Sequence, residues 1–280
     1  MSKGAPTYLD RIVPLVLRRL DERKERLPLD ELAASAGVGA LPSFADALRL
    51  PGVSLIAEVK RASPSKGPIR PDLDVGQIVR AYEAAGARAV SVLTEEDHFR
   101  GCLEDLRVAA ANTGLPLLRK DFIVDEYQVH EARVFGASAV LLIAALLDDE
   151  RLQGLAGLAF HLGLDVLLEV HDAAQMARAL RIEGAVIGVN NRDLHTFSVS
   201  LDTTARLASL VPPERLLIGE SGIEDHADVI RLARLGVDGI LVGESILRTA
   251  DVGWAIRGLL QPAAPVASRP VDYAHKKEAR

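Results

Sequence analysis

The feature that most constrains this chain is an alternation of short apolar runs with amphipathic segments, which begins near residue 53 and continues to about residue 260. Eight runs rich in β-branched residues or leucine are candidate strands, namely 53–60, 89–93, 115–122, 139–145, 165–170, 185–191, 216–221 and 239–245. The segments between them have helical spacing, and several end in Gly-Ala or Gly-Val, which is typical of a helix C-terminus. Eight strand–helix alternations over about 200 residues predict an α/β fold, the (β/α)₈ TIM barrel.

Aspartate recurs where the expected helices begin, and an aspartate at this position accepts a hydrogen bond from an otherwise unpaired amide and complements the helix dipole. These positions are Asp74, Asp125, Asp148, Asp172, Asp202, Asp225 and Asp251. The alternative fold is a doubly wound open sheet. That fold normally has fewer strands and often a Gly-rich first turn, and no G-x-G-x-x-G follows the run at 53–60.

Residues 1–50 do not follow this alternation. The segment 8–28 places aliphatic side chains among charged ones at helical spacing, and "SFADALR" at 43–49 indicates a further short helix. We therefore expect an N-terminal helical extension over 1–50, packed across one end of a catalytic barrel formed by 51–260. Residues 261–280 have little apolar surface to bury and are predicted to form a disordered tail.

Composition excludes several classes of partner. The net charge of −6 gives no basic surface for a nucleic acid, and the longest apolar run, 139–147, is too short to span a membrane. A single cysteine, Cys102, excludes an intrachain disulfide framework and fits a reducing compartment. The N-terminus lacks the apolar core of a signal peptide. We expect a cytoplasmic protein that binds neither nucleic acid nor membrane.

Polar side chains gather at the C-terminal ends of the expected strands, where barrels of this type carry their chemistry. Glu58 and Lys60 are two residues apart in one strand, so both point to the same face. Lys120 and Glu169 also lie in otherwise apolar runs. Because an unpaired buried charge is costly, we expect these four side chains to meet at one mouth, where acid–base chemistry is favoured.

Two further strand ends resemble an anion site. "GESG" ends the seventh run and "VGES" ends the eighth, at the positions where such barrels usually bind phosphate. The seven histidines are scattered without a cysteine partner or an H-E-x-x-H motif, so no metal site is expected. Asp121 and Glu95 fit a structural role as well as a functional one. Phe99, Phe122 and Phe197 follow strand ends and fit an aromatic-binding pocket or plain packing.

The order and spacing of several motifs resemble the indole-3-glycerol-phosphate synthase family over about residues 7–260. The motifs are "IAEVKRASPSKG", "LRKDFIVDEYQV", "LLEVHD", "IGVNNRDL", "IGESGI" and "LVGES". The resemblance implies a lyase of tryptophan biosynthesis that converts 1-(2-carboxyphenylamino)-1-deoxyribulose 5-phosphate into indole-3-glycerol phosphate, CO₂ and water. It implies no cofactor and no metal, and a phosphosugar substrate as the only partner. We expect a monomer or a weak homo-oligomer.

The resemblance also implies the residues of the site. The catalytic residues are Glu58, Lys60, Lys120, Glu169 and Asn190, and the substrate- and phosphate-binding residues are Ser63, Arg192, Ser221 and the backbone at Gly243, Glu244 and Ser245. The GESG strand end described above adds Glu220 and Gly222 to the substrate- and phosphate-binding residues. Lys120 would act as the cationic acid on the ketone oxygen, while Lys60 would orient the substrate carboxylate or serve as the acid in dehydration. The base is Glu58 or Glu169.

Glu244 departs from the small residue that the family often has at this position. A carboxylate beside a phosphate would repel it, so we expect a role for its backbone amide only. Two alternatives remain for the whole chain. One is a barrel like phosphoribosylanthranilate isomerase, which needs an acid–base pair but no decarboxylation. The other is a phosphosugar-binding barrel without catalytic activity.

Overall fold

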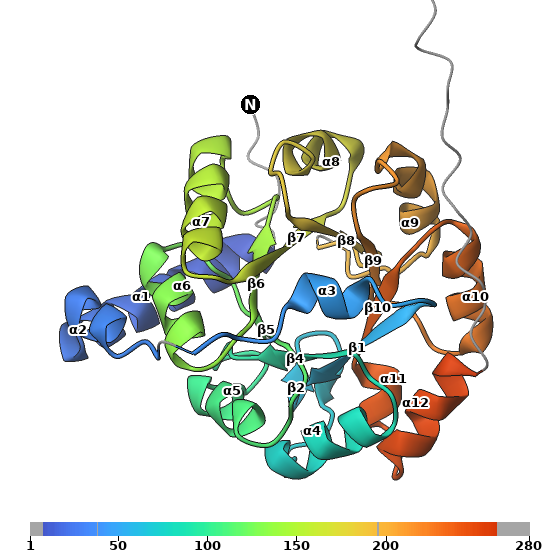
Figure 1. Cartoon of the computed structure of the whole chain (residues 1–280), viewed down its shortest axis with the longest axis horizontal. Helices are drawn as coiled ribbons and strands as arrows, with labels where there is room; N and C mark the ends of the chain where they lie inside the picture. Colours follow the sequence, from blue (N-terminus) through green and yellow to red (C-terminus); the bar gives the residue numbers. More distant parts are fainter. Residues whose placement is uncertain (1–7, 38, 195, 262–280) are drawn as a thin grey trace, which may run out of the picture.

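Eight parallel strands form a closed barrel in the computed structural model, which describes residues 8–37, 39–194 and 196–261 (Figure 1). The strands are β1 (Ser54–Val59), β4 (Ala89–Leu93), β5 (Leu117–Lys120), β6 (Ala139–Ile143), β7 (Asp165–Val170), β8 (Val186–Asn190), β9 (Leu217–Glu220) and β10 (Gly239–Val242). Neighbouring strands follow chain order, and β1 pairs with both β4 and β10 to close the barrel. The predicted TIM barrel is confirmed, and the open sheet is excluded.

The strands read as apolar runs because both of their faces are buried. One face fills the barrel interior and the other packs against the surrounding helices, so most residues within the strands are apolar. All six residues of β1 and all five of β6 are buried. Beyond β1 the chain forms a small antiparallel hairpin from β2 (Ala62–Ser63) and β3 (Gly67–Pro68).

Helices surround the barrel as an outer ring (Figure 1). They are α4 (Val75–Ala84), α5 (Leu103–Ala110), α6 (Glu126–Val134), α7 (Asp149–His161), α8 (Ala173–Ala179), α9 (Asp202–Leu207) with the 3₁₀ turn η1 (Ala208–Leu210), α10 (His226–Arg234), α11 (Glu244–Leu247) and α12 (Val252–Leu260). Six of the predicted aspartate N-caps are confirmed, since each carboxylate accepts a backbone N–H of the first turn: Asp74, Asp125, Asp148, Asp172, Asp225 and Asp251.

Asp202 is the exception. It is the first residue of α9, and the residue before it, Leu201, makes no side-chain cap. The Asp202 carboxylate instead pairs with Arg231 of α10. The prediction of an N-cap at Asp202 was wrong because an ion pair between helices takes the carboxylate.

Three helices precede the barrel: α1 (Tyr8–Arg26), α2 (Leu29–Ala34) and α3 (Phe44–Leu48). Among these described helices, α3 lies across the end of the barrel that faces the viewer in Figure 1. The amide of Ala45 donates to Asp165 Oδ2 at the start of β7, and Ser54 at the start of β1 donates to the carbonyl of Leu48. The expectation that the whole extension packs across one end was therefore correct for α3 alone.

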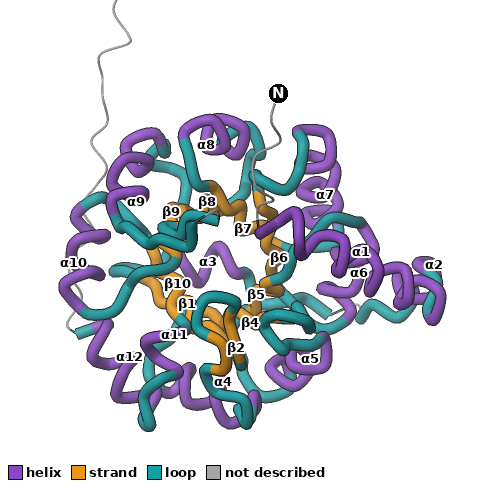
Figure 2. Tube along the Cα trace, turned by 180° about the vertical axis from the view of Figure 1, so that it is seen from behind, coloured by secondary structure: helices purple, strands orange, loops and turns teal. Residues whose placement is uncertain are grey.

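Helices α1 and α2 pack on the flank of the barrel against α6. Leu20 and Leu32 form a small apolar cluster with Tyr127 of α6. Because α3 covers the end where the strands begin, the end where they finish faces the other side of the molecule, which Figure 2 shows.

Two further predictions concern the C-terminal tail and membrane-spanning segments. Of the expected disordered tail, 261–280, all but Gln261 lies outside the described residues. Within the described part of the chain, no helix combines the length and the apolar character needed to cross a membrane.

Candidate active site

The C-terminal ends of the strands surround a cavity of about 860 Å³. Every residue that the sequence placed in the site lines this cavity, although the residues come from six different strands and the loops that follow them. They are Glu58, Lys60, Ser63, Lys120, Glu169, Asn190, Arg192, Glu220, Ser221, Gly222, Gly243, Glu244 and Ser245. The charges in the apolar runs therefore meet in one place.

Lys120 is the last residue of β5, and its ammonium group lies between two carboxylates. Nζ is 3.0 Å from Glu220 Oε2 and 3.3 Å from Glu169 Oε2. Burial alone would lower the pKa of Lys120, but Glu220, Glu169 and Glu58 outweigh this effect and raise the pKa above its ordinary value. Lys120 is thus a firmly held cation, able to stabilise negative charge that develops on an adjacent oxygen.

The two carboxylates beside Lys120 differ in their protonation. Burial raises the pKa of Glu220 to about 7, since the lowering by Lys120 is opposed by Glu169 and Glu58. Burial also disfavours the charge on Glu169, but Lys120, His171 and Asn190 together lower the pKa of Glu169 below its ordinary value. Near neutral pH, Glu169 is ionised and can accept a proton, whereas Glu220 is near the midpoint of its titration.

Glu58 and Lys60 form a second pair on β1 and the residue that follows it, with Glu58 Oε1 2.5 Å from Lys60 Nζ. Glycines on neighbouring strands make room for the carboxylates. A Cβ on Gly243 would lie 2.4 Å from Glu58 Oε1, and a Cβ on Gly188 would lie 2.2 Å from Glu220 Oε1. Only glycine leaves space for these two side chains to point into the barrel.

Asn190 and Arg192 continue the rim after β8. Asn190 Oδ1 accepts the backbone N–H of Arg192 at 3.0 Å. This contact leaves the Asn190 amide nitrogen as a donor, and the Asn190 side chain bonds to Glu169. Arg192 Nη1 lies 3.4 Å from the carbonyl oxygen of Phe197 and extends along the cavity.

Small residues line the part of the cavity beyond β9 and β10, which are adjacent strands. Ser221 and Gly222 both have positive φ, at 65° and 76°. Such a conformation is strained for serine, and strain of this kind is concentrated at functional sites. Ser63 lies in the hairpin that follows β1, the strand next to β10. Its hydroxyl is buried and makes no hydrogen bond with the described part of the chain, so its capacity to form one is unused.

The side chains of two residues grouped with this anion site have other partners. Glu220 bonds to Lys120, and a carboxylate at that position would repel a phosphate, so its assignment to phosphate binding does not fit the geometry. Glu244 turns to two cations that also line the cavity, with its Oε1 3.0 Å from Arg248 Nη2 and 4.0 Å from Lys66 Nζ. Only the backbone amide of Glu244 remains as an anion ligand.

Aromatic rings form another part of the cavity wall. Tyr8 at the start of α1 contacts Phe197 and Phe122 edge to face, with ring centroids 5.4 and 6.2 Å apart, and Phe99 lies 6.3 Å from Phe122. The three phenylalanines were candidates from the sequence, but Tyr8 was not, because one aromatic residue on an amphipathic helix does not indicate a binding site. It also missed Lys66 and Arg248.

Asp121 and Glu95 both accept hydrogen bonds within the protein, and Asp121 also lines the cavity. Asp121 Oδ2 accepts hydrogen bonds from Arg119 at 3.0 Å and from Thr94 at 2.6 Å. Glu95 accepts three backbone N–H groups of the loop that follows it. Within residues 8–37, 39–194 and 196–261, no group of three histidine, cysteine, aspartate or glutamate side chains could hold a metal ion.

Comparison with known proteins gives one consistent result. Residues 9–259 match the family model described as indole-3-glycerol phosphate synthase. The indole-3-glycerol phosphate synthase of Dehalococcoides mccartyi (strain BAV1) is 49% identical over 257 residues, which cover 90% of this chain and 99% of the relative. That of Leuconostoc mesenteroides is 44% identical over 256 residues, covering 90% and 98%. Among solved structures, 3-hexulose-6-phosphate synthase from Salmonella typhimurium aligns with a TM-score of 0.57 at 15% identity, covering 75% of this chain and 97% of that one, and this likeness concerns the fold alone.

Proposed function

Because the chain belongs to the indole-3-glycerol phosphate synthase family, we propose that its cavity performs that family's reaction with Lys120 and the surrounding carboxylates. The protein is a decarboxylating lyase of tryptophan biosynthesis. Its reaction closes the ring of 1-(2-carboxyphenylamino)-1-deoxyribulose 5-phosphate, releases CO₂ and water, and leaves indole-3-glycerol phosphate. The observation that carries the assignment of roles is the position of Lys120 between Glu169 and Glu220 in the cavity.

The substrate has an aryl end and a phosphate end, and the cavity has a matching region for each. The rings of Tyr8, Phe99, Phe122 and Phe197 suit the aryl group. The phosphate is assigned to Ser63, Ser221 and the backbone amides of Gly222, Gly243, Glu244 and Ser245. Support comes from the unpaired Ser63 hydroxyl and from the small residues at the ends of β9 and β10.

Ring closure needs a cation beside the ketone. As the aryl carbon attacks, the ketone oxygen gains negative charge and then a proton. Lys120 is the cation assigned to this oxygen, because it is held charged in the protein interior. Glu220, with a pKa of about 7, is a proton source in direct contact with Lys120.

Decarboxylation and dehydration follow. Lys60 is assigned to the carboxylate that leaves as CO₂, and it is also the available acid for the departing hydroxyl. Glu169 is the base that we assign to the proton removed in dehydration, since its pKa is lowered and it is ionised. Glu58 positions Lys60 through their contact at 2.5 Å. Asn190 orients Glu169, and Arg192 holds the substrate in place.

No cofactor or metal takes part in this scheme, because the ammonium and carboxylate groups supply the acid and base for each step. We further propose that the enzyme acts in the cytoplasm, as a monomer or a weak homo-oligomer. The support for the cytoplasm is that the single Cys102 is a free thiol, which fits a reducing compartment.

Incubation of the purified protein with the carboxyphenylamino ketose phosphate tests the assignment. We expect indole fluorescence and one CO₂ per substrate consumed. Conversion of phosphoribosylanthranilate without CO₂ release would indicate an isomerase instead. Tight binding of the ketose phosphate without turnover would indicate a barrel that binds phosphosugars and does not catalyse. Either result would contradict the proposed roles.

A further inference from the structure

His171 is a half-buried imidazole next to the proposed base that no step above uses. It follows β7 directly and lies outside the residues that line the cavity. Its Nε2 is 3.5 Å from Glu169 Oε1, on the opposite carboxylate oxygen from the one that contacts Lys120. This Nε2 atom is shielded from solvent and makes no hydrogen bond within the described part of the chain.

The other ring nitrogen faces Gln175 of α8. Gln175 Nε2 donates to Asp172 Oδ2 at 3.0 Å, and Gln175 Oε1 accepts the backbone N–H of His171 at 3.0 Å. The amide oxygen of Gln175 therefore faces the His171 ring, where Nδ1 lies 3.4 Å away. Since Gln175 Oε1 is an acceptor, it favours the forms of the ring that carry a hydrogen on Nδ1.

Both ring nitrogens thus face acceptors. In a neutral ring with hydrogen on Nδ1, the lone pair of Nε2 would point at the Glu169 carboxylate, which is repulsive. In the imidazolium, each nitrogen carries a hydrogen toward an oxygen. The charged groups around the ring are Glu169 on β7 and Asp172 at the start of α8, with Lys120 of β5 beyond Glu169.

Resting on the proposed function, we propose that His171 is a positioning residue that decides which of the two carboxylates beside Lys120 carries the proton. Lys120 contacts both Glu169 and Glu220, so it does not distinguish between them. His171 lies on the Glu169 side, where a charge on its ring favours the ionised carboxylate. It thereby keeps the negative charge on Glu169, the base, and leaves the proton on Glu220.

The opposite shifts of the two groups agree with this arrangement. Burial raises the pKa of Glu220 to about 7, while Lys120 and His171, against the effect of burial, lower the pKa of Glu169. Glu220 Oε1 makes no hydrogen bond within the described residues. This carboxyl group is thus the one better suited to remain protonated.

The decisive variant is His171→Gln, which keeps an N–H near Glu169 but removes the positive charge. The kcat of CO₂ release is measured from about pH 3.5 to 8, because the pKa of Glu169 is below its ordinary value. We expect the acidic limb of the profile to move upward by about one pH unit, because Glu169 then ionises only at higher pH. At a pH on that limb, kcat should fall roughly tenfold and recover as the pH rises above the limb.

The matched control is His226→Gln, which alters a half-buried histidine whose Nδ1 contacts the carbonyl of Leu259 outside the cavity. Its acidic limb should stay in place. A uniform loss of kcat in His171→Gln, with the limb unmoved, would assign His171 a structural role and overturn the proposal.

A second measurement does not depend on turnover. In protein labelled at the glutamate carboxyl carbon, the Glu169 resonance, assigned with Glu169→Gln, should titrate at higher pH in His171→Gln than in the wild type. The same titration in both proteins would contradict the proposal. If the wild type released no CO₂, the proposed function would fail, and this titration would still decide where the proton resides.

Discussion

Two clusters of buried charged side chains lie on opposite faces of β5. They differ in how completely their polar atoms are paired by hydrogen bonds. Lys120 points into the cavity and Arg119, its neighbour in sequence, points away toward α6, because successive residues of a strand face opposite sides. Both clusters contain a cation between two carboxylates. They differ in what else surrounds those charges.

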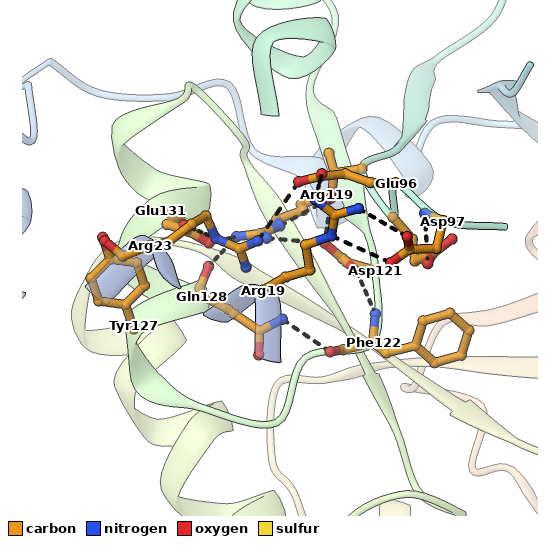
Figure 3. Close-up of polar contacts among 12 residues, drawn as sticks. Arg19, Arg23, Glu96, Asp97, Arg119, Asp121, Phe122, Tyr127, Gln128 and Glu131 are labelled. Atoms are coloured by element: carbon orange, nitrogen blue, oxygen red, sulfur yellow. Dashed lines mark hydrogen bonds and ion pairs between the residues drawn. The ribbon is translucent and has the colours of Figure 1, made fainter. Parts of the chain in front are cut away.

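The cluster around Arg119 is nearly saturated, although one member, Asp121, also lines the cavity. Arg119, 1% exposed, donates to Thr94, to the carbonyl of Gln128, to Glu131 and to Asp121. Arg23 of α1 adds a second cation at Glu131, 2.7 Å from Oε1, as Figure 3 shows. The same figure shows Arg19 joining α1 to Asp97 in the loop after β4. This network ties the N-terminal helix to the barrel.

The cluster around Lys120 is left incomplete. Glu220 Oε1 has no hydrogen bond in the described part of the chain, and the group opens on the cavity. Saturated charges hold a structure in place, whereas incompletely paired charges can change protonation and take up a ligand. One strand thus carries a structural cation and a catalytic one side by side.

The largest expected effect separates the two cations by activity. Lys120→Met should lower kcat by about 10²–10⁴-fold because the developing oxyanion loses its cation. The melting temperature should change little, since the carboxylates left behind can take up protons from the cavity. Rates of CO₂ release and thermal unfolding are compared with those of Lys24→Met, which removes a surface partner of Asp125. A variant with near-normal kcat would refute the role of Lys120.

Arg119→Met should show the opposite pattern. It leaves Asp121 and Glu131 buried beside an apolar side chain, which costs about 3–5 kcal/mol of unfolding free energy. Denaturant titration measures this loss, and kcat per folded molecule should stay within a few-fold of the wild type. An unchanged midpoint of unfolding would show that the two clusters do not differ as described.

Glu220→Gln tests the incomplete pairing around Lys120 through the pH dependence of stability. Burial raises the pKa of Glu220 to about 7 in the folded protein, above the ordinary value of 4.5, so the folded state binds more protons between these values. The proton that Glu220 binds more tightly in the folded state stabilises the protein at low pH. This stabilisation is lost as the pH rises from the ordinary value through about 7. The glutamine variant, neutral at every pH, should therefore unfold at a higher temperature than the wild type at pH 8, by a few degrees for roughly 2 kcal/mol.

The matched measurement for this variant is thermal unfolding at about pH 4, below the ordinary value of 4.5. There Glu220 of the wild type is mostly protonated in the folded and the unfolded protein and resembles glutamine in both, so the two melting temperatures should nearly coincide. An equal difference at both pH values would contradict a raised pKa at Glu220.

Arg23→Met should give the smallest effect. Glu131 keeps its contact with Arg119, and the Arg23 side chain is partly exposed, so the loss should be about 1 kcal/mol. Chemical unfolding followed by tryptophan or far-ultraviolet signals measures it. A loss as large as that of Arg119→Met would mean that α1, and not Arg119, holds the flank together.

Much of the fold and part of the site followed from local sequence. The eight strands lie within the eight predicted runs, because burial on both faces demands continuous apolar sequence. The spacing of Glu58 and Lys60 predicted that both point to one face. The C-terminal ends of all the barrel strands surround one mouth, so charged side chains at these ends are expected to lie together there. Local sequence failed at Asp202, where a partner on another helix takes the carboxylate.

Local sequence was enough to predict the barrel, most of its helix caps and the set of charged strand ends, because these depend on periodicity and on the cost of burying charge. Which side chains contact one another could be seen only in the folded barrel. Lys120 and Glu220 are 100 residues apart, Tyr8 reaches the rings from the extension, and His171 faces Glu169 through a turn that Gln175 fixes. Contacts of this kind form when the barrel closes. Groups that are far apart in the sequence then become neighbours in space and shift each other's pKa values.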